Sequence, residues 1–502
     1  MEINLQLLIF EFKYQSTIIV LQQGSIGMKN GEVVFLDRVQ KYIILSIGLY
    51  FGWLLSVPFN GPIIYATMAF VETNISIPTI YIFFHAIGLL VLGIMVKIAE
   101  HWRSLIIYGG ALSLVLGLLV FFMPPIMWPF IYAVIGFCSA MFVLGWSYPF
   151  AHGIDNKSRM KYMALAIILA NIVYVLLSIL LTILTLQLVY IMALLCIVVA
   201  LRFSLLLTRV EFQNIQNKKD EIEEIPVFPG AFMLIVSLLI FGLYINGGFM
   251  YQVMYPSLER YENIAVFYRN IPYIAVLAVM WRYGNHLQKQ LPIYMGVSFM
   301  GLAFISFLLM HNTLPGFFLI ETLIQSSFAF LDLFFFTILG DISAINRKPI
   351  RTFGFGMTAM VGAILVGGLL GGQLMMIGER YYLFTAMFAL SAIFLTFLII
   401  PWMFNKIEDF YYSSNHEESN NELTNMEIVQ SIFEAHSLTV RETEIVEHLL
   451  QGLTNKQIAA ELYVSENTLK THIKNIYYKL QIKSRRELMH RVLENKENHS
   501  LG

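Results

Sequence analysis

Between Lys161 and Arg202 the chain reads MALAIILANIVYVLLSILLTILTLQLVYIMALLCIVVAL (residues 163–201), without one charged side chain. A helix that crosses the hydrocarbon core of a bilayer needs about 20 apolar residues. The run therefore predicts two membrane-spanning helices, joined by a tight hairpin near residues 183–185.

The same apolar signal recurs over most of the chain. Of its 502 residues, 58% are hydrophobic and 13% are charged, whereas a soluble domain has about 25% charged residues. This composition excludes a soluble enzyme for most of the chain and indicates an all-α, polytopic membrane protein. A polar loop from Asn214 to Glu224 divides the predicted helices into two halves of six. The twelve spans are predicted at residues 42–66, 77–97, 104–123, 127–149, 161–183, 185–206, 229–251, 264–281, 292–311, 316–340, 353–377 and 382–404.

The distribution of lysine and arginine predicts the orientation of these spans. With the N-terminus inside the cell, seventeen Lys and Arg residues fall on inner loops and three, Arg260, Arg269 and Arg380, fall on the outer side. Short cytoplasmic loops carry the excess of positive charge in membrane proteins. We therefore expect a multi-pass protein of the cytoplasmic (inner) membrane with both termini in the cytoplasm.

The segments outside the spans differ in character. Residues 1–40 form an N-terminal segment that lacks the features of a signal peptide, and residues 1–27 suggest an over-extended gene start. The transmembrane domain is expected to cover residues 41–404. Residues 405–435 are acidic and rich in Asn and Ser, as is typical of a solvated linker. Residues 436–502 form a separate amphipathic helical segment.

Capping signals predict four helices in this C-terminal segment. Capping boxes begin at Thr439, Thr454 and Ser484, and Ser465 is a good N-cap residue. A short turn joins the predicted second and third helices, 455–462 and 466–480, as in a helix-turn-helix. The apolar positions that recur at helical spacing predict one small core: Ile445, Leu449, Ile458, Leu462, Ile473, Ile476, Leu480 and Leu488.

The solvent face of the third predicted helix is basic. It carries Lys470, Thr471, Lys474 and Lys479, with Glu466 as its acidic residue. Lysines on such a helix can reach DNA phosphates or the acceptor edge of guanine in the major groove.

One set of residues in this segment has the spacing of a known family: Leu438, Thr439, Arg441, Glu442, Glu444, Gly452, Thr454, Asn455, Lys456, Ile458, Ala459, Ser465, Thr468, Lys470, His472, Asn475, Ile476, Lys479, Leu480, Ser484 and Arg485. On these residues the segment resembles the DNA-binding domain of LuxR/GerE-type regulators over about 60 residues. The resemblance implies a homodimeric transcription factor that binds double-stranded DNA. It also implies that Lys470, Thr471 and Lys474 read bases, and that Thr454, Lys456, Ser465 and Lys479 hold the DNA backbone.

Two alternatives to DNA binding remain for this segment. A basic helical tail of this kind can also dock on the inner leaflet of the membrane or on a protein partner. A tail that binds a protein partner predicts no loss of function when Lys470 and Lys474 are replaced by alanine.

The membrane segment, with two halves of six spans, resembles the major facilitator superfamily in architecture. That superfamily carries a Gly/Asp/Arg-rich signature between its second and third spans. Here the corresponding loop, Gly93 to Arg103, lacks the aspartate. The difference argues against conventional transport more than against the fold.

Polar residues inside the spans indicate a central ligand site. Asn60-Gly61-Pro62 and Asn246-Gly247-Gly248 interrupt corresponding spans of the two halves, a pattern that points to a binding site in transporter folds. Ionisable residues within spans are costly and are therefore functional candidates. A pair between Asp332 and Arg269 is one possibility. The alternatives are that the interruptions mark helix ends and that the charged residues pair structurally. The candidate ligand-binding residues are Asn60, His85, Asn246, Arg269, Glu321 and Asp332.

The sequence contains no motif for catalysis, cofactor binding or metal binding. The two cysteines, Cys138 and Cys196, lie inside apolar runs, so no disulfide framework is indicated. We therefore expect a bacterial, membrane-embedded, one-component transcriptional regulator that senses a small molecule, and not an enzyme. The alternative is an active transporter of the facilitator type with a regulatory DNA- or protein-binding tail.

Overall fold

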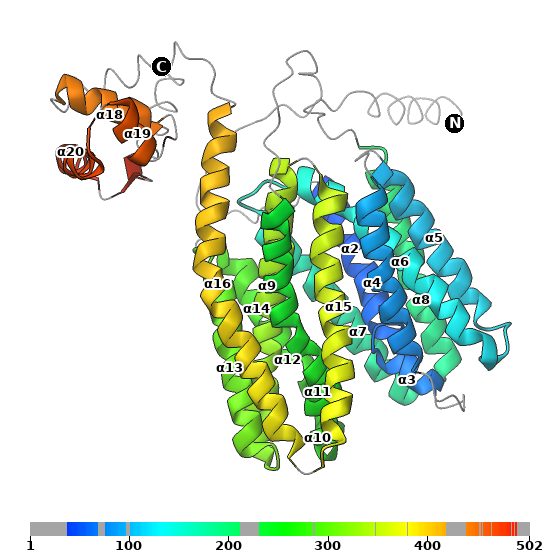
Figure 1. The fold of residues 1–502 in the computed structure, drawn as a ribbon. Helices are drawn as coiled ribbons and strands as arrows, with labels where there is room; N and C mark the ends of the chain where they lie inside the picture. The colour runs from blue at the N-terminus through cyan, green and yellow to red at the C-terminus, as the bar shows by residue number, and fades with distance from the viewer. Residues whose placement is uncertain are drawn as a thin grey trace, which may run out of the picture. The chain divides into compact units, whose positions relative to one another are not determined.

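The computed structural model consists of helices throughout the part of the chain that it describes (Figure 1). It describes residues 38–68, 76–96, 101–210, 230–284, 287–346, 348–378, 380–417, 438–450, 453, 455–462, 464–482, 484–485 and 487–488. The predictions for residues 1–37, including the over-extended gene start, lie outside these ranges.

Twelve helical spans in the described residues are long and apolar enough to cross a membrane, which confirms the predicted number. The helices of the first half are α2 (Arg38–Ser56), α3 (Pro62–Met68), α4 (Ile77–Met95), α5 (Trp102–Leu119), η2 (Pro125–Met127), α6 (Trp128–His152), α7 (Arg159–Ile183) and α8 (Leu186–Leu207). Those of the second half are α9 (Gly230–Phe249), η4 (Met250–Met254), α10 (Tyr255–Ser257), η5 (Glu259–Tyr261), α11 (Glu262–Tyr268), α12 (Asn270–Tyr283), α13 (Leu291–Met310), α14 (Leu314–Asn346), α15 (Pro349–Met375) and α16 (Tyr381–Glu417).

Two helices of the second half run past their predicted ends. The tenth span was predicted to end at residue 340, but α14 continues to Asn346. The twelfth was predicted to end at residue 404, but α16 continues to Glu417. The first part of the predicted linker, 405–435, is therefore helical. Residues 418–435 lie outside the described ranges.

The two predicted interruptions differ in the structure. The chain leaves helical geometry between Ser56 and Pro62, and Asn60 has a φ of 53°, so the first interruption is confirmed. The second prediction was wrong, because α9 continues through Asn246 and passes into the π-helical turn η4 at Met250. The side-chain amide of Asn246 donates to the carbonyl oxygens of Gly242 and Leu243 at 3.3 and 3.0 Å, so this polar side chain is satisfied within its own helix.

The halves meet mainly along two helix pairs, α4 with α15 and α7 with α12, with further contacts of α6 with α14 and α15 and of α7 with α14. At the α4–α15 contact, Gly93 and Gly354 face each other, and a Cβ atom on Gly354 would lie 2.6 Å from the Cα atom of Gly93. Because real Cβ atoms do not approach so closely, the contact requires glycine at both positions. The two halves are thus in backbone contact at this point.

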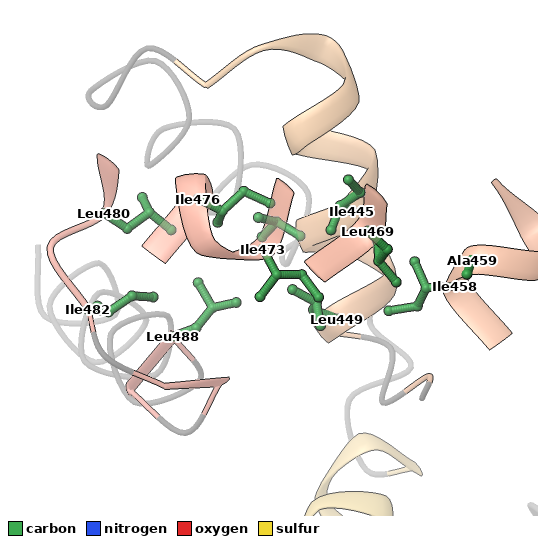
Figure 2. Packing of buried hydrophobic residues seen from close by; sticks show 11 residues of the cluster. Ile445, Leu449, Ile458, Ala459, Leu469, Ile473, Ile476, Leu480, Ile482 and Leu488 are labelled. Atoms are coloured by element: carbon green, nitrogen blue, oxygen red, sulfur yellow. The ribbon is translucent and has the colours of Figure 1, made fainter. Parts of the chain in front are cut away.

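The C-terminal domain consists of α18 (Val440–Leu450), α19 (Asn455–Glu461) and α20 (Glu466–Lys479) in the described residues. Side chains from all three helices point into one core (Figure 2). Of the predicted core, Leu462 is partly buried and the other seven positions are buried. The predicted fourth helix lies mainly outside the described residues, although Leu488 packs on the core and the Ser484 hydroxyl accepts the N–H of Glu487 at 3.3 Å.

Gly354→Ala should destabilise the contact between the halves. The added methyl group would meet the Gly93 backbone, and overpacking of this kind costs about 1–3 kcal/mol. We expect the purified protein to unfold at a lower temperature than the wild type in a thermal denaturation experiment. Gly362→Ala on the same helix is the control, because a Cβ atom there meets nothing within 4 Å. Equal melting temperatures for the two variants would contradict the close contact.

Candidate functional site

A cavity of about 690 Å³ lies between the two halves of the bundle. Its lining comes from α2, α3, α4 and α7 of the first half and from α9 to α12, α14 and α15 of the second. Its volume is within the range of about 300–1,000 Å³ that is typical of small-molecule sites. Asn60, Glu259 and Glu262 place it toward the end of the bundle that holds α3, α10 and α11 (Figure 1).

Asp332 lies in this cavity, as the sequence suggested. The hydroxyl of Tyr244 donates to Oδ1 of Asp332, and the hydroxyl of Tyr273 donates to Oδ2 at 2.5 Å. The two tyrosines come from α9 and α12 and the aspartate from α14. Three helices of the second half therefore fix the position of this carboxylate.

The suggested pair between Asp332 and Arg269 is not formed. Nε of Arg269 is 3.2 Å from Oε1 of Glu321, and its NH2 group is 3.3 Å from Oε2 of Glu262. The guanidinium also stacks on the ring of Tyr255, 3.8 Å from its centroid. Arg269 lines the cavity, but its charge is already matched by two carboxylates.

The remaining ligand candidates divide into two groups. Asn60 and His85 line the cavity from the first half, and Nδ1 of His85 lies 2.7 Å from the Ser139 hydroxyl. Asn246 and Glu321 are fully buried, and neither is among the residues that line the cavity. Glu321 therefore acts on the cavity through Arg269.

An ion cluster that the sequence did not reveal joins the halves near the other end of the bundle. We call Arg159, Asp341, Lys289 and Asn156 the Asp341 cluster. Arg159 is paired with Oδ1 of Asp341, and Nζ of Lys289 is 2.7 Å from Oδ2. Lys289 also donates to Asn156. Arg159 and Asp341 expose only 3% and 6% of their side chains, so this pair is almost entirely removed from solvent.

The Asp341 cluster lies beyond the end of the cavity. On α14 the lining residues end at Phe336, and on α7 they begin at Ile167. Asp341 and Arg159 are each more than a helical turn further along. The cluster therefore holds the halves together where the cavity has ended.

The basic helix of the C-terminal domain is α20. The Ser465 hydroxyl caps it by accepting the N–H of Thr468 at 3.1 Å, as its sequence predicts. Lys470, Thr471 and Lys474 are exposed along the helix, and the face opposite them, Leu469, Ile473 and Ile476, is buried. Ser465 is exposed as well, so four of the predicted DNA-binding side chains are accessible. The DNA contacts expected of them stay predictions.

Lys479 has a partner inside the domain. Its Nζ lies 2.6 Å from Oε2 of Glu442, and the same oxygen accepts the N–H of Thr439 at 2.8 Å. Glu442 thereby completes the predicted capping box of α18 and ties α18 to α20. The DNA-backbone contact expected of Lys479 stays a prediction, as do those of Thr454 and the Lys456 side chain, which lie outside the described residues.

Arg485 is a second link that sequence reasoning missed. Its guanidinium donates to the carbonyl oxygens of Leu453 and Leu449 at 2.8 and 2.5 Å. These carbonyls belong to the end of α18 and the residues after it, where backbone acceptors lack helical partners. The sequence shows an arginine next to a predicted helix start. The carbonyl oxygens that it binds belong to another helix, and tertiary packing brings them together.

Comparison with known proteins assigns the C-terminal domain. The family model of bacterial regulatory proteins, luxR family, matches residues 436–492. The nitrate/nitrite response regulator NarP of Escherichia coli is 52% identical over 48 residues, which are 10% of this chain and 22% of that protein. The regulator MalT of Vibrio cholerae is 39% identical over 71 residues, 14% of this chain and 8% of that protein. The chain thus spans less than a quarter of the length of these relatives. Its C-terminal segment is a LuxR-type helix-turn-helix domain.

Solved structures assign the fold of the membrane domain. The human organic anion transporter MFSD10 (TETRAN) matches with a TM-score of 0.56 at 13% identity, over 72% of this chain and 99% of that one. The major facilitator superfamily transporter FucP, in an outward conformation, matches with a TM-score of 0.50 at 13% identity, over 73% and 99%. The membrane domain therefore has a fold like that of the major facilitator superfamily. At this identity the likeness concerns the fold alone.

Glu442→Gln should destabilise the LuxR-type domain. Burial disfavours its charged form, but hydrogen bonds from Lys479 and Thr439 outweigh this and hold the pKa of Glu442 below its usual value near 4.5. The carboxylate therefore contributes stability above that pH, and the contribution is lost as the pH falls through the lowered pKa. We expect the variant to lose about 1–2 kcal/mol at pH 7 and to depend less on pH below about 4.5.

Urea denaturation of residues 430–502, whose core residues all come from this domain, measures this effect. Glu444→Gln is the matched control, because its ion pair with Arg441 is about 40% exposed on both sides and such pairs contribute little. A loss as large in Glu444→Gln as in Glu442→Gln would contradict the assigned role of Glu442.

Proposed function

We propose that the chain is a membrane-embedded, one-component transcriptional regulator. In this proposal the twelve-helix domain binds a small molecule and controls DNA binding by the LuxR-type domain. The observation that supports it best is the cavity between the halves, on the same chain as a domain whose recognition helix exposes Lys470, Thr471 and Lys474. A ligand there contacts both halves and so responds to their relative position.

The proposed coupling requires two arrangements of the halves. A ligand shifts such an equilibrium only by the difference between its affinities for the two states. The Asp341 cluster is formed in the arrangement described here and would break in one that separates α7 from α14. The helix α16, which continues 11 residues beyond Lys406, connects such a change to the segment before the LuxR-type domain.

The orientation proposed from sequence suits this function. Near the Asp341 cluster, Lys157 and Lys289 lie in loops and Arg282 lies in the last turn of α12. Positive charge at the ends of spans is typical of the cytoplasmic side. With this end inside the cell, the LuxR-type domain reaches chromosomal DNA at the inner membrane. We further propose that it binds double-stranded DNA as a homodimer, since two half-sites double the number of phosphate contacts.

Replacing Lys470 and Lys474 by alanine should abolish sequence-specific DNA occupancy by the intact protein. Each exposed lysine on α20 that contacts a base or phosphate adds affinity. Losing both from each subunit of the proposed homodimer should weaken binding by tenfold or more, and the salt slope should fall by about one for each phosphate contact that is lost. Genome-wide occupancy in the bacterial host measures the first effect, and binding at several salt concentrations measures the second.

Lys406→Ala is the control for charge, because it removes a lysine outside the DNA-binding domain. Sharp peaks for the wild type and this control, lost in the double variant at equal protein level, would support the proposal. Peaks that persist in the double variant would contradict it. Substrate uptake by a chain cut after Glu417, which keeps α16 whole, would favour the transporter alternative.

Arg159→Gln and Asp341→Asn should both change DNA occupancy in the absence of ligand, and in the same direction. Asp341→Asn leaves the buried Arg159 without its carboxylate partner, which costs about 3–5 kcal/mol in the arrangement that forms the pair. Arg159→Gln leaves Asp341 with Lys289 and should therefore cost less. The cost of Asp341→Asn is enough to shift a two-state equilibrium by more than tenfold. A reporter gene under an occupied promoter measures the change at matched protein levels.

Lys289→Ala provides a graded comparison at the same cluster. Its side chain is 46% exposed, so its pair with Asp341 is screened by solvent and its loss should change occupancy less. Opposite directions for Arg159→Gln and Asp341→Asn, or a larger effect from Lys289→Ala, would contradict a conformational role for the cluster.

A further inference from the structure

We propose that the central cavity binds an organic cation with an aromatic or apolar body. The inference rests on the proposed function and names the class of ligand that the membrane domain would recognise. Two observations support it: the carboxylates on the cavity wall of the second half, and the aromatic side chains on the wall of the first half.

The described residues that line the cavity carry more acid than base. Asp332, Glu259 and Glu262 supply carboxylates, and Arg269 is the one lysine or arginine among them. Arg269 is already paired with Glu262 and with the buried Glu321. The wall therefore presents an excess of negative charge, and an anionic ligand would find no free guanidinium or ammonium group there.

Asp332 is the carboxylate placed to hold a cation. Its oxygens accept from Tyr244 and Tyr273, which orient the group but are neutral donors. A carboxylate has about four acceptor sites, so both oxygens retain capacity toward the cavity. A charge removed from bulk water is costly unless an opposite charge matches it, and among the described residues no Lys or Arg pairs with Asp332. A bound cation would supply that match.

The first half of the bundle supplies a wall without carboxylates, lysines or arginines among its described lining residues, in which aromatic rings lie among aliphatic and amide side chains. Phe51, Tyr65 and Tyr174 line the cavity from α2, α3 and α7, and Phe336 and Tyr251 continue this surface on the second half. Aromatic faces attract cations within about 6 Å of the ring centroid, and more strongly where water is excluded. They also bury an apolar body.

His85 is the one histidine among the described residues that line the cavity, and it lies on the first half. Its Nδ1 lies 2.7 Å from the Ser139 hydroxyl and 3.1 Å from the carbonyl oxygen of Gly136. It is thus held against α6. The charged groups that a ligand meets are those of the second half, and a cation held at Asp332 would extend its body toward the first.

A pair of ions with the same shape and opposite charge tests this inference. Tetraphenylphosphonium and tetraphenylborate differ mainly in sign, so any difference in specific binding reports the electrostatics of the site. We would measure saturable binding of each to the full-length protein in an uncharged detergent by equilibrium dialysis, with empty micelles as background. We expect tetraphenylphosphonium to bind at least tenfold more tightly. Equal or tighter binding of tetraphenylborate would overturn the proposal.

Substitutions then locate the charge. Asp332→Asn should weaken tetraphenylphosphonium binding about tenfold or more, and Asp155→Asn, a carboxylate-to-amide change in a loop outside the cavity, should leave it unchanged. If Asp332→Asn does not fold, Glu259→Gln at the exposed mouth should weaken binding about two- to threefold, as expected of a screened charge. Unchanged affinity in the folded cavity variants would overturn the assignment.

The failure of this inference can be told apart from failure of the proposed function. Binding of tetraphenylphosphonium that leaves DNA occupancy unchanged in cells would support the cation site and contradict sensing by it. The opposite result is that DNA occupancy responds to neutral or anionic compounds through the cavity, while tetraphenylphosphonium shows no saturable binding. That result would support sensing by the membrane domain and overturn the cation site.

Discussion

The buried ion pair between Arg159 and Asp341 connects the two halves of the membrane domain where the cavity has ended. Removing two charges from water costs several kcal/mol for each ion, and their attraction repays this only in good geometry. Arg159 gains further hydrogen bonds to the carbonyl oxygens of Ala151 and Ile154 at 2.9 and 3.1 Å, and Asp341 gains Lys289. A pair of this kind adds little net stability over apolar packing, but it forms in only one register of α7 against α14. It therefore specifies one arrangement of the halves and, with it, the shape of the cavity.

The chemistry of the cavity is divided between those halves. Every carboxylate and the one guanidinium among its described lining residues lie on the second half, from Glu259 to Asp332, whereas the first half contributes aromatic rings, amides and His85. A ligand that satisfies Asp332 and also fills the space beside Phe51 must contact both. Its affinity then depends on the distance between the halves, which is the differential binding that a conformational response requires.

Local signals in the sequence were sufficient to predict the spans and the LuxR-type domain, because apolar length and capping boxes depend on neighbouring residues. Pairings between distant residues were not predictable in the same way. Asp341 lies one residue past the predicted end of its span, and its partner Arg159 is one of the seventeen Lys and Arg residues that were assigned to inner loops. Arg269 pairs with Glu321 and not with Asp332. Both carboxylates lie on α14, about three helical turns apart, and the sequence does not show which of them stands beside Arg269. Asn246 matches Asn60 in pattern, but the helix continues there because the amide is satisfied by Gly242 and Leu243.

The length of α16 bears on how a change in the bundle can reach the DNA-binding domain. A solvated linker that began at residue 405 would tether that domain and transmit little orientation. A helix from Tyr381 to Glu417, with Pro401 inside it, instead extends about 16 Å beyond Lys406 at 1.5 Å per residue. Its earlier part packs on α9 and α13. Because Glu417 lies far from the centre of the bundle, a tilt of the second half would displace this end of α16 by more than it displaces the residues at the bundle centre. In a dimer, two such ends would move together or apart, and the spacing of two recognition helices is what a pair of DNA half-sites measures.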